Sequence, residues 1–432
     1  MTTLENIYKC FLEARQNVST DSRQIEKGCL FFALKGENFN GNRYAEDALK
    51  SGALYSIVDE EEFATSERTI LVDDVLTTLQ NLALLHRRKL GIPILGITGT
   101  NGKTTTKELI AAVLSEKYKV SFTQGNLNNH IGVPLTLLKM NDKTEFGVVE
   151  MGANHPGEIA QLCQIADPDF GIITNVGKAH LEGFGSFEGV IKTKGELYEC
   201  IGKKNGIIFY NRNNTYLEKL GEQIQNKISY GTDDDGFKGE LLHSPPFVHL
   251  KVNFPKGVLY LNTKLIGDFN FENVLAAACI GNHFEIDPLK IQRAIKNYEP
   301  RNNRSQLIVK GDLKIIMDAY NANPTSMKAS LESFAAQKSD FAYLILGDML
   351  ELGEYSFDEH RSILHTIKEK GFQNVFLVGK EFAKANEKFS FSSYEKVEDL
   401  CLFLQQKPIK NGNVLIKGSR GIKLEKVLDY LN

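Results

Sequence analysis

The sequence predicts an α/β protein with three domains: a small N-terminal α/β domain, a central domain with a parallel sheet and a β insert, and a C-terminal Rossmann-like α/β domain. Three observations lead to this prediction. The chain has 432 residues, more than one hydrophobic core usually serves. Short apolar runs alternate with stretches of helical periodicity from about residue 90 to about residue 300, and a second such series begins near residue 303. Within the first series, residues 228–265 are rich in Val, Leu, Tyr and turn residues.

The first domain is placed at residues 1–88. Its strands are predicted at residues 29–34 and 54–58, and its helices at residues 44–51 and 75–89. The apolar residues of these segments are spaced as a small mixed α/β unit requires.

The central domain is placed at residues 89–302 and the third at residues 303–432. The central strands are predicted at residues 92–97, 146–150, 170–174 and 206–210, with an antiparallel β insert at 228–265 and a helix at 270–282. The C-terminal strands are predicted at residues 313–317, 342–346, 374–378 and 413–416. Apolar strands that alternate with helices predict a parallel sheet with helices on both faces.

Composition narrows the class of protein. Hydrophobic residues make up 42% of the chain and charged residues 24%, and the net charge is −3. These values are ordinary for a soluble globular protein, and we expect no nucleic-acid partner. No apolar run approaches the ~20 residues that span a bilayer, the first residues do not resemble a signal peptide, and the six cysteines have no metal-site spacing. We therefore expect a cytoplasmic protein without a transmembrane segment.

A glycine-rich turn between a strand and a helix is the most informative motif. The run Gly99-Thr100-Asn101-Gly102-Lys103-Thr104 follows the strand at 92–97 and precedes a helical pattern at 108–114. The backbone N–H groups of such a turn and the helix N-terminus bind phosphate. Lys103 can reach the β- and γ-phosphates, and the Thr104 hydroxyl can bind Mg²⁺. Ile97 stands where the general P-loop pattern has its first glycine, which indicates a particular subfamily of P-loop proteins.

Polar residues follow two further strands at the same edge of the predicted sheet. Glu150 ends the strand at 146–150, and His180 lies in the loop after the strand at 170–174. Ligands of open parallel sheets sit at this edge, so Glu150 is expected to bind Mg²⁺ beside Thr104. His180 is a candidate for a metal or phosphate contact. From its position alone, Lys194 is either a phosphate clamp or a solvated charge.

Together these residues resemble the Mur ligases, the ATP-dependent amide-forming enzymes of peptidoglycan synthesis. The matching elements are the loop 98–104, Glu150, Asn175 with His180, and Lys194. The resemblance implies that Lys103, Glu150, His180 and Lys194 are catalytic. It also implies two Mg²⁺ ions held by Thr104, Glu150, His180 and Lys194. Lys194 would be carbamylated, which turns a cation into a metal-binding carboxylate.

Four longer segments are similar to one branch of this family, at residues 125–136, 318–327, 346–353 and 417–420. Members of that branch ligate D-alanyl-D-alanine to UDP-N-acetylmuramoyl-tripeptide through an acyl phosphate, releasing ADP and phosphate. The resemblance implies the same substrates here and a place in cell wall biogenesis, cell shape and cell division. It also implies a monomer.

The resemblance assigns the binding residues one by one. For ATP it implies Gly99, Thr100, Asn101, Gly102, Lys103, Thr104, Thr105, Asn270, Asn273, Arg304, Asp318, Tyr320 and Asn321. For the other substrates it implies Ser22, Arg23, Lys35, Gly36, Asn126, Asn128, Asn129 and Asn323, the first four of them in a UDP-binding N-terminal domain. Phe269 departs from the family, which often has a histidine before the asparagine that matches Asn270.

Three other functions are compatible with parts of the pattern. A sister ligase would add a free amino acid to a UDP-muramoyl peptide, or glutamate to folate, but the segments at 318–327 and 346–353 weigh against it. A switch or motor ATPase would hydrolyse ATP without an acceptor and would need no UDP-binding domain. A degenerate binding module is disfavoured by the complete Gly102-Lys103-Thr104 sequence and by Glu150.

Overall fold

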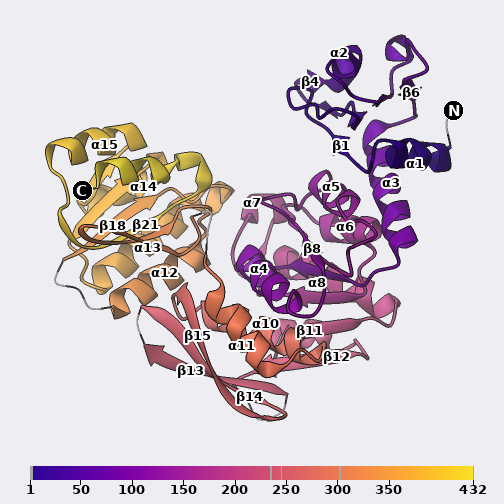
Figure 1. Cartoon of the computed structure of the whole chain (residues 1–432). Coiled ribbons are helices and arrows are strands. Elements are labelled where there is room, and N and C mark those ends of the chain that lie inside the picture. Colours follow the sequence, from indigo (N-terminus) through magenta and orange to yellow (C-terminus); the bar gives the residue numbers. More distant parts are fainter. Residues whose placement is uncertain are drawn as a thin grey trace.

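The computed structural model of the chain describes residues 3–233, 236–244, 246–300, 303–337, 339 and 341–431. Figure 1 shows three α/β units that follow one another along the chain. The predicted class is confirmed, since each unit contains a mainly or partly parallel sheet that is packed against helices.

The N-terminal unit is built on a four-stranded parallel sheet in the order β1-β2-β5-β6. Its elements are α1 (Leu4–Glu13), β1 (Val18–Ser19), β2 (Leu30–Phe32), β3 (Lys35–Gly36), β4 (Phe39–Asn40), a 3-10 helix (Gly41–Tyr44), α2 (Ala45–Lys50), β5 (Tyr55–Val58), a 3-10 helix (Glu61–Phe63), β6 (Thr69–Leu71) and α3 (Val75–Leu90). The strand predicted at 29–34 is shorter than expected because the chain turns at its end into the β3–β4 hairpin.

The central unit contains nine strands in the order β15-β14-β13-β12-β11-β10-β7-β9-β8. Its first elements are β7 (Ile94–Thr98), α4 (Lys103–Leu114), β8 (Val120–Phe122), α5 (Gly132–Leu138), β9 (Phe146–Glu150), α6 (Glu158–Ala166), β10 (Phe170–Ile173), α7 (Leu181–Phe184) and α8 (Phe187–Lys203). The remaining elements are β11 (Ile207–Asn211), α9 (Thr215–Gly221), β12 (Lys227–Gly231), β13 (Phe237–Ser244), β14 (Phe247–Phe254), β15 (Gly257–Ile266), α10 (Asn270–His283) and α11 (Pro288–Asn297).

Alternate residues of the central strands enter two separate cores. Val149 and Ile173 pack with helices on one face of the sheet, whereas their neighbours Val148 and Ile172 pack with α4 and α10 on the other. This alternation follows from the period of two in a β-strand and confirms the prediction of helices on both faces.

The antiparallel insert begins later than predicted. β12 lies within the segment predicted to be antiparallel, but it pairs with β11 in parallel, with Ile208 opposite Lys227. The cause is α9, which crosses between the two strands and returns the chain in the same direction, as a parallel pair requires. Among the described residues of this sheet, only the pairs β13–β14 and β14–β15 are antiparallel, because β13 pairs with β12 in parallel. These three strands extend the sheet at the bottom of Figure 1.

The C-terminal unit has a six-stranded sheet in the order β16-β17-β21-β18-β19-β20, parallel except for β16. Its elements are β16 (Gln306–Lys310), β17 (Asp312–Asp318), α12 (Pro324–Ala336), β18 (Ala342–Gly347), α13 (Ser356–Glu369), β19 (Asn374–Val378), α14 (Lys380–Ala385), β20 (Ser392–Tyr394), α15 (Val397–Gln406) and β21 (Asn411–Lys417), with 3-10 helices at Gly353–Tyr355, Asn386–Lys388, Arg420–Ile422 and Leu424–Tyr430. Leu344 and Ile345 enter different cores, so this sheet is also covered on both faces.

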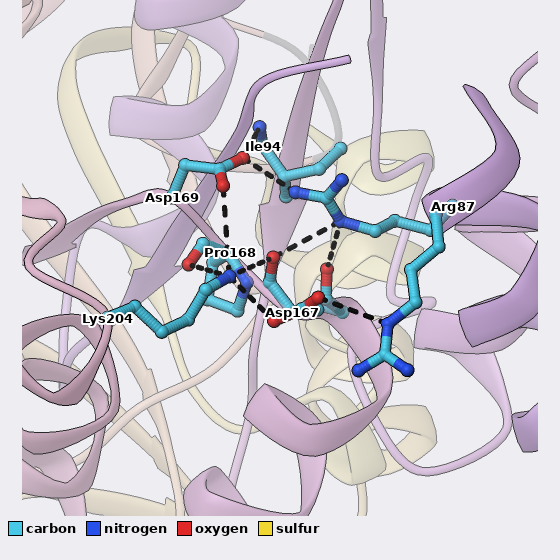
Figure 2. A network of polar contacts seen from close by, with 8 residues as sticks. Arg87, Ile94, Asp167, Pro168, Asp169 and Lys204 are labelled. Atoms are coloured by element: carbon cyan, nitrogen blue, oxygen red, sulfur yellow. Dashed lines mark hydrogen bonds and ion pairs between the residues drawn. The ribbon is translucent and has the colours of Figure 1, made fainter. Parts of the chain in front are cut away.

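Helix α3 fastens the N-terminal unit to the central unit, and Figure 2 shows the polar network at its end. Arg87 donates to the carbonyl of Asp167 (3.1 Å) and to the carboxylate of Asp169 (2.6 Å), and its residue is only 7% exposed. Asp169 also accepts from the backbone N–H of Ile94 (2.9 Å), and Lys204, directly after α8, donates to Asp167 (2.6 Å). The network ties α3 to β7, β10 and α8, so this end of the N-terminal unit is held on the sheet that carries the glycine-rich turn.

No helix in the described part of the chain is both long and apolar enough to cross a membrane.

Candidate active site

A cavity of about 830 Å³ lies where the central and C-terminal units meet. Its walls combine the turn after β7, the ends of β9 and β10, the start of α10, and loops of the C-terminal unit. Among the residues predicted to bind ATP or substrate, those lining it are Thr100, Asn101, Gly102, Lys103, Thr104, Thr105, Asn126, Asn128, Asn129, Asn270, Asn273, Arg304, Asp318, Tyr320, Asn321 and Asn323. Glu150 and His180 also line it. Segments that are hundreds of residues apart in the sequence therefore meet around one cavity.

The turn after β7 needs glycine at two positions. Gly99 has φ +143° and Gly102 has φ +77°, both in the region that favours glycine. A Cβ atom would lie 2.0 Å from the Thr174 hydroxyl oxygen at Gly99, and 2.5 Å from the Asn273 side-chain oxygen at Gly102. The turn is thus packed closely against β10 and α10, which holds its backbone N–H groups at the start of α4.

Lys103, the first residue of α4, curls back over the turn. Its Nζ donates to the carbonyls of Gly99 (2.7 Å) and Thr100 (3.0 Å). Burial lowers the pKa of Lys103 to about 8, the charge of Glu150 opposes this effect, and the positive charge of Arg304 adds to it. The charges of Lys103 and Arg304 therefore act on each other within the cavity that both side chains line.

Glu150 is held from several sides at the end of β9, where it is 2% exposed. One carboxylate oxygen accepts from the Thr104 hydroxyl (2.9 Å), and the other accepts from the Asn128 amide (2.8 Å). The structure thus brings together the two predicted magnesium ligands Thr104 and Glu150. Asn128 positions the carboxylate, and Asn129 instead accepts from backbone N–H groups at the start of α5, including that of Gly132 (2.9 Å).

Lys107 is a buried charge that the sequence analysis did not assign. Its Nζ lies 3.5 Å from Glu150 Oε2, and the side chain is 1% exposed. Lys107 is one turn after Lys103 on α4, on the side that faces the sheet, so only the position of Glu150 makes it part of the site. The signal that could have identified Lys107 is its spacing, since a lysine four residues after the P-loop lysine lies on the same face of the helix.

His180 lies at the start of α7 with φ +51°. Its Nδ1 is 2.5 Å from Oε2 of Glu351 in the C-terminal unit, an ion-pair distance, although the direction of approach does not form a regular hydrogen bond. Two further contacts cross between the units nearby: the Asn323 amide donates to Asn101 (2.8 Å), and Lys178 lies 2.8 Å from Glu359. The loop after β10 therefore contacts the C-terminal unit at several points.

Lys194 is buried below this loop rather than exposed, which excludes the reading of a solvated charge. It is 2% exposed and does not line the cavity, and its Nζ donates to the Ala153 carbonyl (3.3 Å). Burial lowers its pKa to about 7, helped by the positive charge of Lys103. A lysine with this pKa is a neutral amine in about half of the molecules at pH 7, and the neutral amine is a nucleophile.

The start of α10 is held to the P-loop helix by asparagine side chains. Asn273 accepts from the Thr106 hydroxyl (3.0 Å) and donates to Asn270 (2.8 Å), and both asparagines are buried. Phe269, immediately before α10, is 37% exposed and lines the cavity. An exposed aromatic ring at this place can pack against a flat heterocycle.

The C-terminal wall of the cavity contains three basic side chains, two of which lie over the ring of Tyr320. Lys417 lies 2.5 Å from Asp318. Arg304 has its guanidinium carbon 3.7 Å from the centre of the Tyr320 ring, and Arg420 has its own at 5.5 Å. Arg420 lies within the family-like segment at 417–420 but is not among the predicted site residues.

The residues predicted to bind the UDP end are not at this cavity. Ser22 and Arg23 precede β2, and Lys35 and Gly36 form β3, all in the N-terminal unit. Arg23 pairs with Asp21 (2.8 Å), and Lys35 lies 3.0 Å from Asp59. Their role in binding stays a prediction.

Family models match nearly the whole chain. The model described as Mur ligase family, catalytic domain, matches residues 15–96, the Mur ligase middle domain matches residues 97–281, and the Mur ligase, glutamate ligase domain matches residues 303–420.

Curated relatives match this chain over most of the length of both proteins. The UDP-N-acetylmuramoyl-tripeptide–D-alanyl-D-alanine ligase of Bacillus subtilis is 36% identical over 425 residues, covering 96% of this chain and 92% of the relative. The ligase of the same name from Escherichia coli is 31% identical over 426 residues, covering 96% and 93%.

Solved structures show the same arrangement. MurF from Acinetobacter baumannii has a TM-score of 0.87 at 28% identity, covering 96% of this chain and 92% of that one. MurF ligase from Thermotoga maritima in complex with ADP has a TM-score of 0.85 at 27% identity, covering 100% and 98%. A UDP-N-acetylmuramoyl-L-alanyl-D-glutamate–2,6-diaminopimelate ligase resembles the chain in fold alone, at 18% identity and a TM-score of 0.55.

Proposed function

The chain belongs to the Mur ligase family, and on that premise we propose that it joins D-alanyl-D-alanine to UDP-N-acetylmuramoyl-tripeptide with conversion of ATP to ADP and phosphate. The observation that carries the proposal is the single cavity in which a P-loop, a buried carboxylate at a strand end and unpaired arginines of a second unit meet. The full-length relatives that are 36% and 31% identical bear the name of this reaction. They do not support the alternative of a sister ligase that adds a free amino acid.

The first step activates a poor acyl donor. The terminal carboxylate of the tripeptide attacks the γ-phosphorus of ATP, which forms an acyl phosphate and releases ADP. Two anions must approach each other for this attack, so the site has to supply positive charge. We assign this task to Lys103, the N–H groups of the turn and Arg304, because these residues line the same cavity and the charge of Arg304 acts on Lys103.

The residues present fit a magnesium site of the kind that binds through phosphates. The Glu150 carboxylate and the Thr104 hydroxyl are in contact at 2.9 Å and both line the cavity, and Mg²⁺ commonly takes one or two such protein oxygens and completes its shell with phosphates and water. When bound, Mg²⁺ would neutralise charge on the phosphates. Lys107 gives the buried Glu150 carboxylate a cationic partner at 3.5 Å and so helps to hold it in place, since a buried carboxylate needs a cationic or hydrogen-bonding partner.

A second ion would need a further oxygen ligand, and Lys194 can supply one only after modification. Its amine can add dissolved CO₂ to give a carbamate and a proton, and the product carries a carboxylate at the end of the side chain. The burial of Lys194 and its pKa of about 7 support this proposal, because they keep the amine neutral and nucleophilic. With His180, the carbamate would form the second magnesium site.

The second step forms the amide bond. The neutral amine of D-alanyl-D-alanine attacks the acyl carbon through a tetrahedral intermediate, and phosphate leaves. Water would hydrolyse the acyl phosphate, so the acceptor has to be held in a site that is largely closed to solvent. The contacts from Asn323 to Asn101 and from Glu351 to His180 bring the C-terminal unit over the reacting groups.

The remaining assignments rest on the resemblance and the placement of residues. Asn270, Asn273 and Phe269 stand beside the P-loop where an adenine could bind. The N-terminal unit would bind the UDP end through Ser22, Arg23, Lys35 and Gly36. We also propose a cytoplasmic, monomeric enzyme, because its reaction consumes ATP and the cavity is formed within one chain.

The test is phosphate release from ATP with Mg²⁺, UDP-muramoyl-tripeptide and D-alanyl-D-alanine, with each component omitted in turn. We expect release only when all are present, together with a UDP-muramoyl-pentapeptide detected by mass spectrometry. Lys103→Met should abolish the reaction, and Lys143→Met, which replaces an exposed lysine of the same unit, should not change it. Release without an acceptor would indicate an ATPase, and release only with a free amino acid would indicate a sister ligase.

A further inference from the structure

Of the three basic residues of the C-terminal wall, the two that lie over Tyr320 have no carboxylate partner in the described part of the chain. Lys417 is neutralised by Asp318, which also accepts from the Ser330 hydroxyl (3.1 Å). Among the described residues, no acidic oxygen lies within ion-pair distance of Arg304 or Arg420. A cavity that keeps two unpaired guanidinium groups on one wall is built to receive anions.

The two arginines lie over the same ring but differ in their other surroundings. Arg304 packs closely on the Tyr320 ring, its Nε is inaccessible to solvent without an acceptor, and its charge is felt at Lys103. These observations place Arg304 on the phosphate side. Arg420 follows β21 in the loop that Ser419 fastens to Leu350, where the Leu350 N–H donates to the Ser419 hydroxyl (3.0 Å). Arg420, Leu350 and Gly421 thus form a part of the wall that belongs wholly to the C-terminal unit.

The incoming dipeptide carries a negative charge that needs such a partner. Its amine must reach the acyl carbon beside the phosphates, and its terminal carboxylate lies two residues away, about 7 Å in an extended peptide. Near the phosphates the carboxylate would be repelled, whereas an arginine further along the wall can bind it with two parallel hydrogen bonds.

We propose that Arg420 binds the terminal carboxylate of the incoming dipeptide and thereby sets the length of acceptor that the enzyme uses. This inference rests on the proposed ligase function and adds a specificity residue to it. A single amino acid is shorter by about 3.5 Å, so it would not reach Arg420 and the acyl carbon together. Arg304, in contrast, serves the nucleotide.

The test compares two acceptors that differ only in this charge, D-alanyl-D-alanine and D-alanyl-D-alaninamide. For the unaltered enzyme, we expect kcat/KM to be about 100-fold higher with the free acid, the usual worth of a charged hydrogen-bonded pair. Arg420→Ala should lose this factor with the acid and keep the value for the amide, and Arg420→Lys should lie between them. KM for ATP should not change in either variant.

Arg361→Ala is the matched control, because Arg361 is an exposed arginine of α13 in the same unit and does not line the cavity. It should leave both acceptors unaffected. Arg420→Ala should also narrow the preference for the dipeptide over free D-alanine. The inference is wrong if Arg420→Ala lowers kcat/KM equally for acid and amide, or if the unaltered enzyme does not distinguish them. If it consumes neither acceptor, the proposed function itself is overturned, and this inference with it.

Discussion

Carbamylation of Lys194 should depend on pH and on dissolved CO₂, and the burial of Lys194 sets the pH range because it lowers the pKa of the amine. Burial lowers the pKa of Lys194 from 10.5 to about 7, which corresponds to about 5 kcal/mol in favour of the neutral amine. At pH 7.5, a lysine with this pKa is neutral in about three-quarters of the molecules, whereas an ordinary lysine is neutral in about one in a thousand. Since only the neutral amine adds CO₂, the folded protein should form the carbamate at Lys194 several hundred times more readily than at an exposed lysine.

The sign of the pH effect follows from the same pKa. As pH rises from 6 to 8, the neutral fraction of Lys194 should rise from about one-tenth to about nine-tenths, so carbamate formation should increase over this window at constant CO₂ pressure. The measurement is ¹³C NMR of the protein equilibrated with ¹³CO₂, where a carbamate carbon is resolved from bicarbonate. Activity in buffers freed of CO₂ should fall and should return when CO₂ is restored.

Two variants separate Lys194 from other lysines. Lys194→Met should remove the carbamate signal and most of the activity while the protein remains folded, because a methionine fits a buried site beside Phe184. Lys192→Met, which replaces an exposed lysine two residues earlier on α8, should leave both unchanged. A wild-type protein with no carbamate signal at pH 8, and with activity that ignores CO₂, would refute the reasoning.

Three further substitutions test packing and contacts of the site. Arg87→Met should lower the free energy of unfolding by about 3 kcal/mol, because Arg87 is buried among the acceptors shown in Figure 2. Arg88→Met, at a side chain that is 62% exposed, should lower it by under about 1 kcal/mol. Denaturant titrations measure both values, and equal effects would contradict the prediction. Asn323→Asp keeps the helix cap of α12 but removes the amide donor to the P-loop, so it should preserve the melting temperature and raise KM for ATP. Asn323→Ala removes the cap as well and should also lose about 1 kcal/mol of stability. Equal melting temperatures for the two variants would argue against the cap. Lys107→Met should destabilise the protein by about 3 kcal/mol, because the buried Glu150 carboxylate loses its lysine partner. The double variant with Glu150→Gln should recover most of that loss in thermal unfolding. Additive losses would show that the two side chains do not interact.

Parts of the candidate site could be predicted because local sequence determines them. The turn from Gly99 to Thr104 needs glycines and a helix start in a fixed order, and Glu150 ends an apolar run, so both positions follow from strand and helix patterns alone. The order of parallel strands then places their ends at one edge. The resemblance in the longer segments added the C-terminal residues Asp318 and Tyr320, which line the same cavity.

Strand direction within the insert could not be predicted with the same certainty. The segment at 228–265 has strand composition throughout, but β12 pairs in parallel with β11 and β13, and antiparallel pairing begins only between β13 and β14. What decides the direction is the crossover helix α9, which precedes the segment and is short enough to be read as a loop. The types of residue in a segment indicate that it forms a strand, whereas the connections between strands determine which strands pair and in which direction.

The α/β class, the P-loop and its strand-end carboxylate follow from local sequence, because each depends on residues close together in the chain. Which charges are buried and which are paired follows instead from how the chain folds. Lys194 could have been a solvated cation, but packing of α8 buries it and lowers its pKa; Lys107 became part of the site only through its distance of 3.5 Å to Glu150. Arg420 differs from Lys417 because Asp318 forms an ion pair with Lys417 and not with Arg420. Desolvation and pairing depend on atoms brought together from distant parts of the chain, and no local pattern contains them.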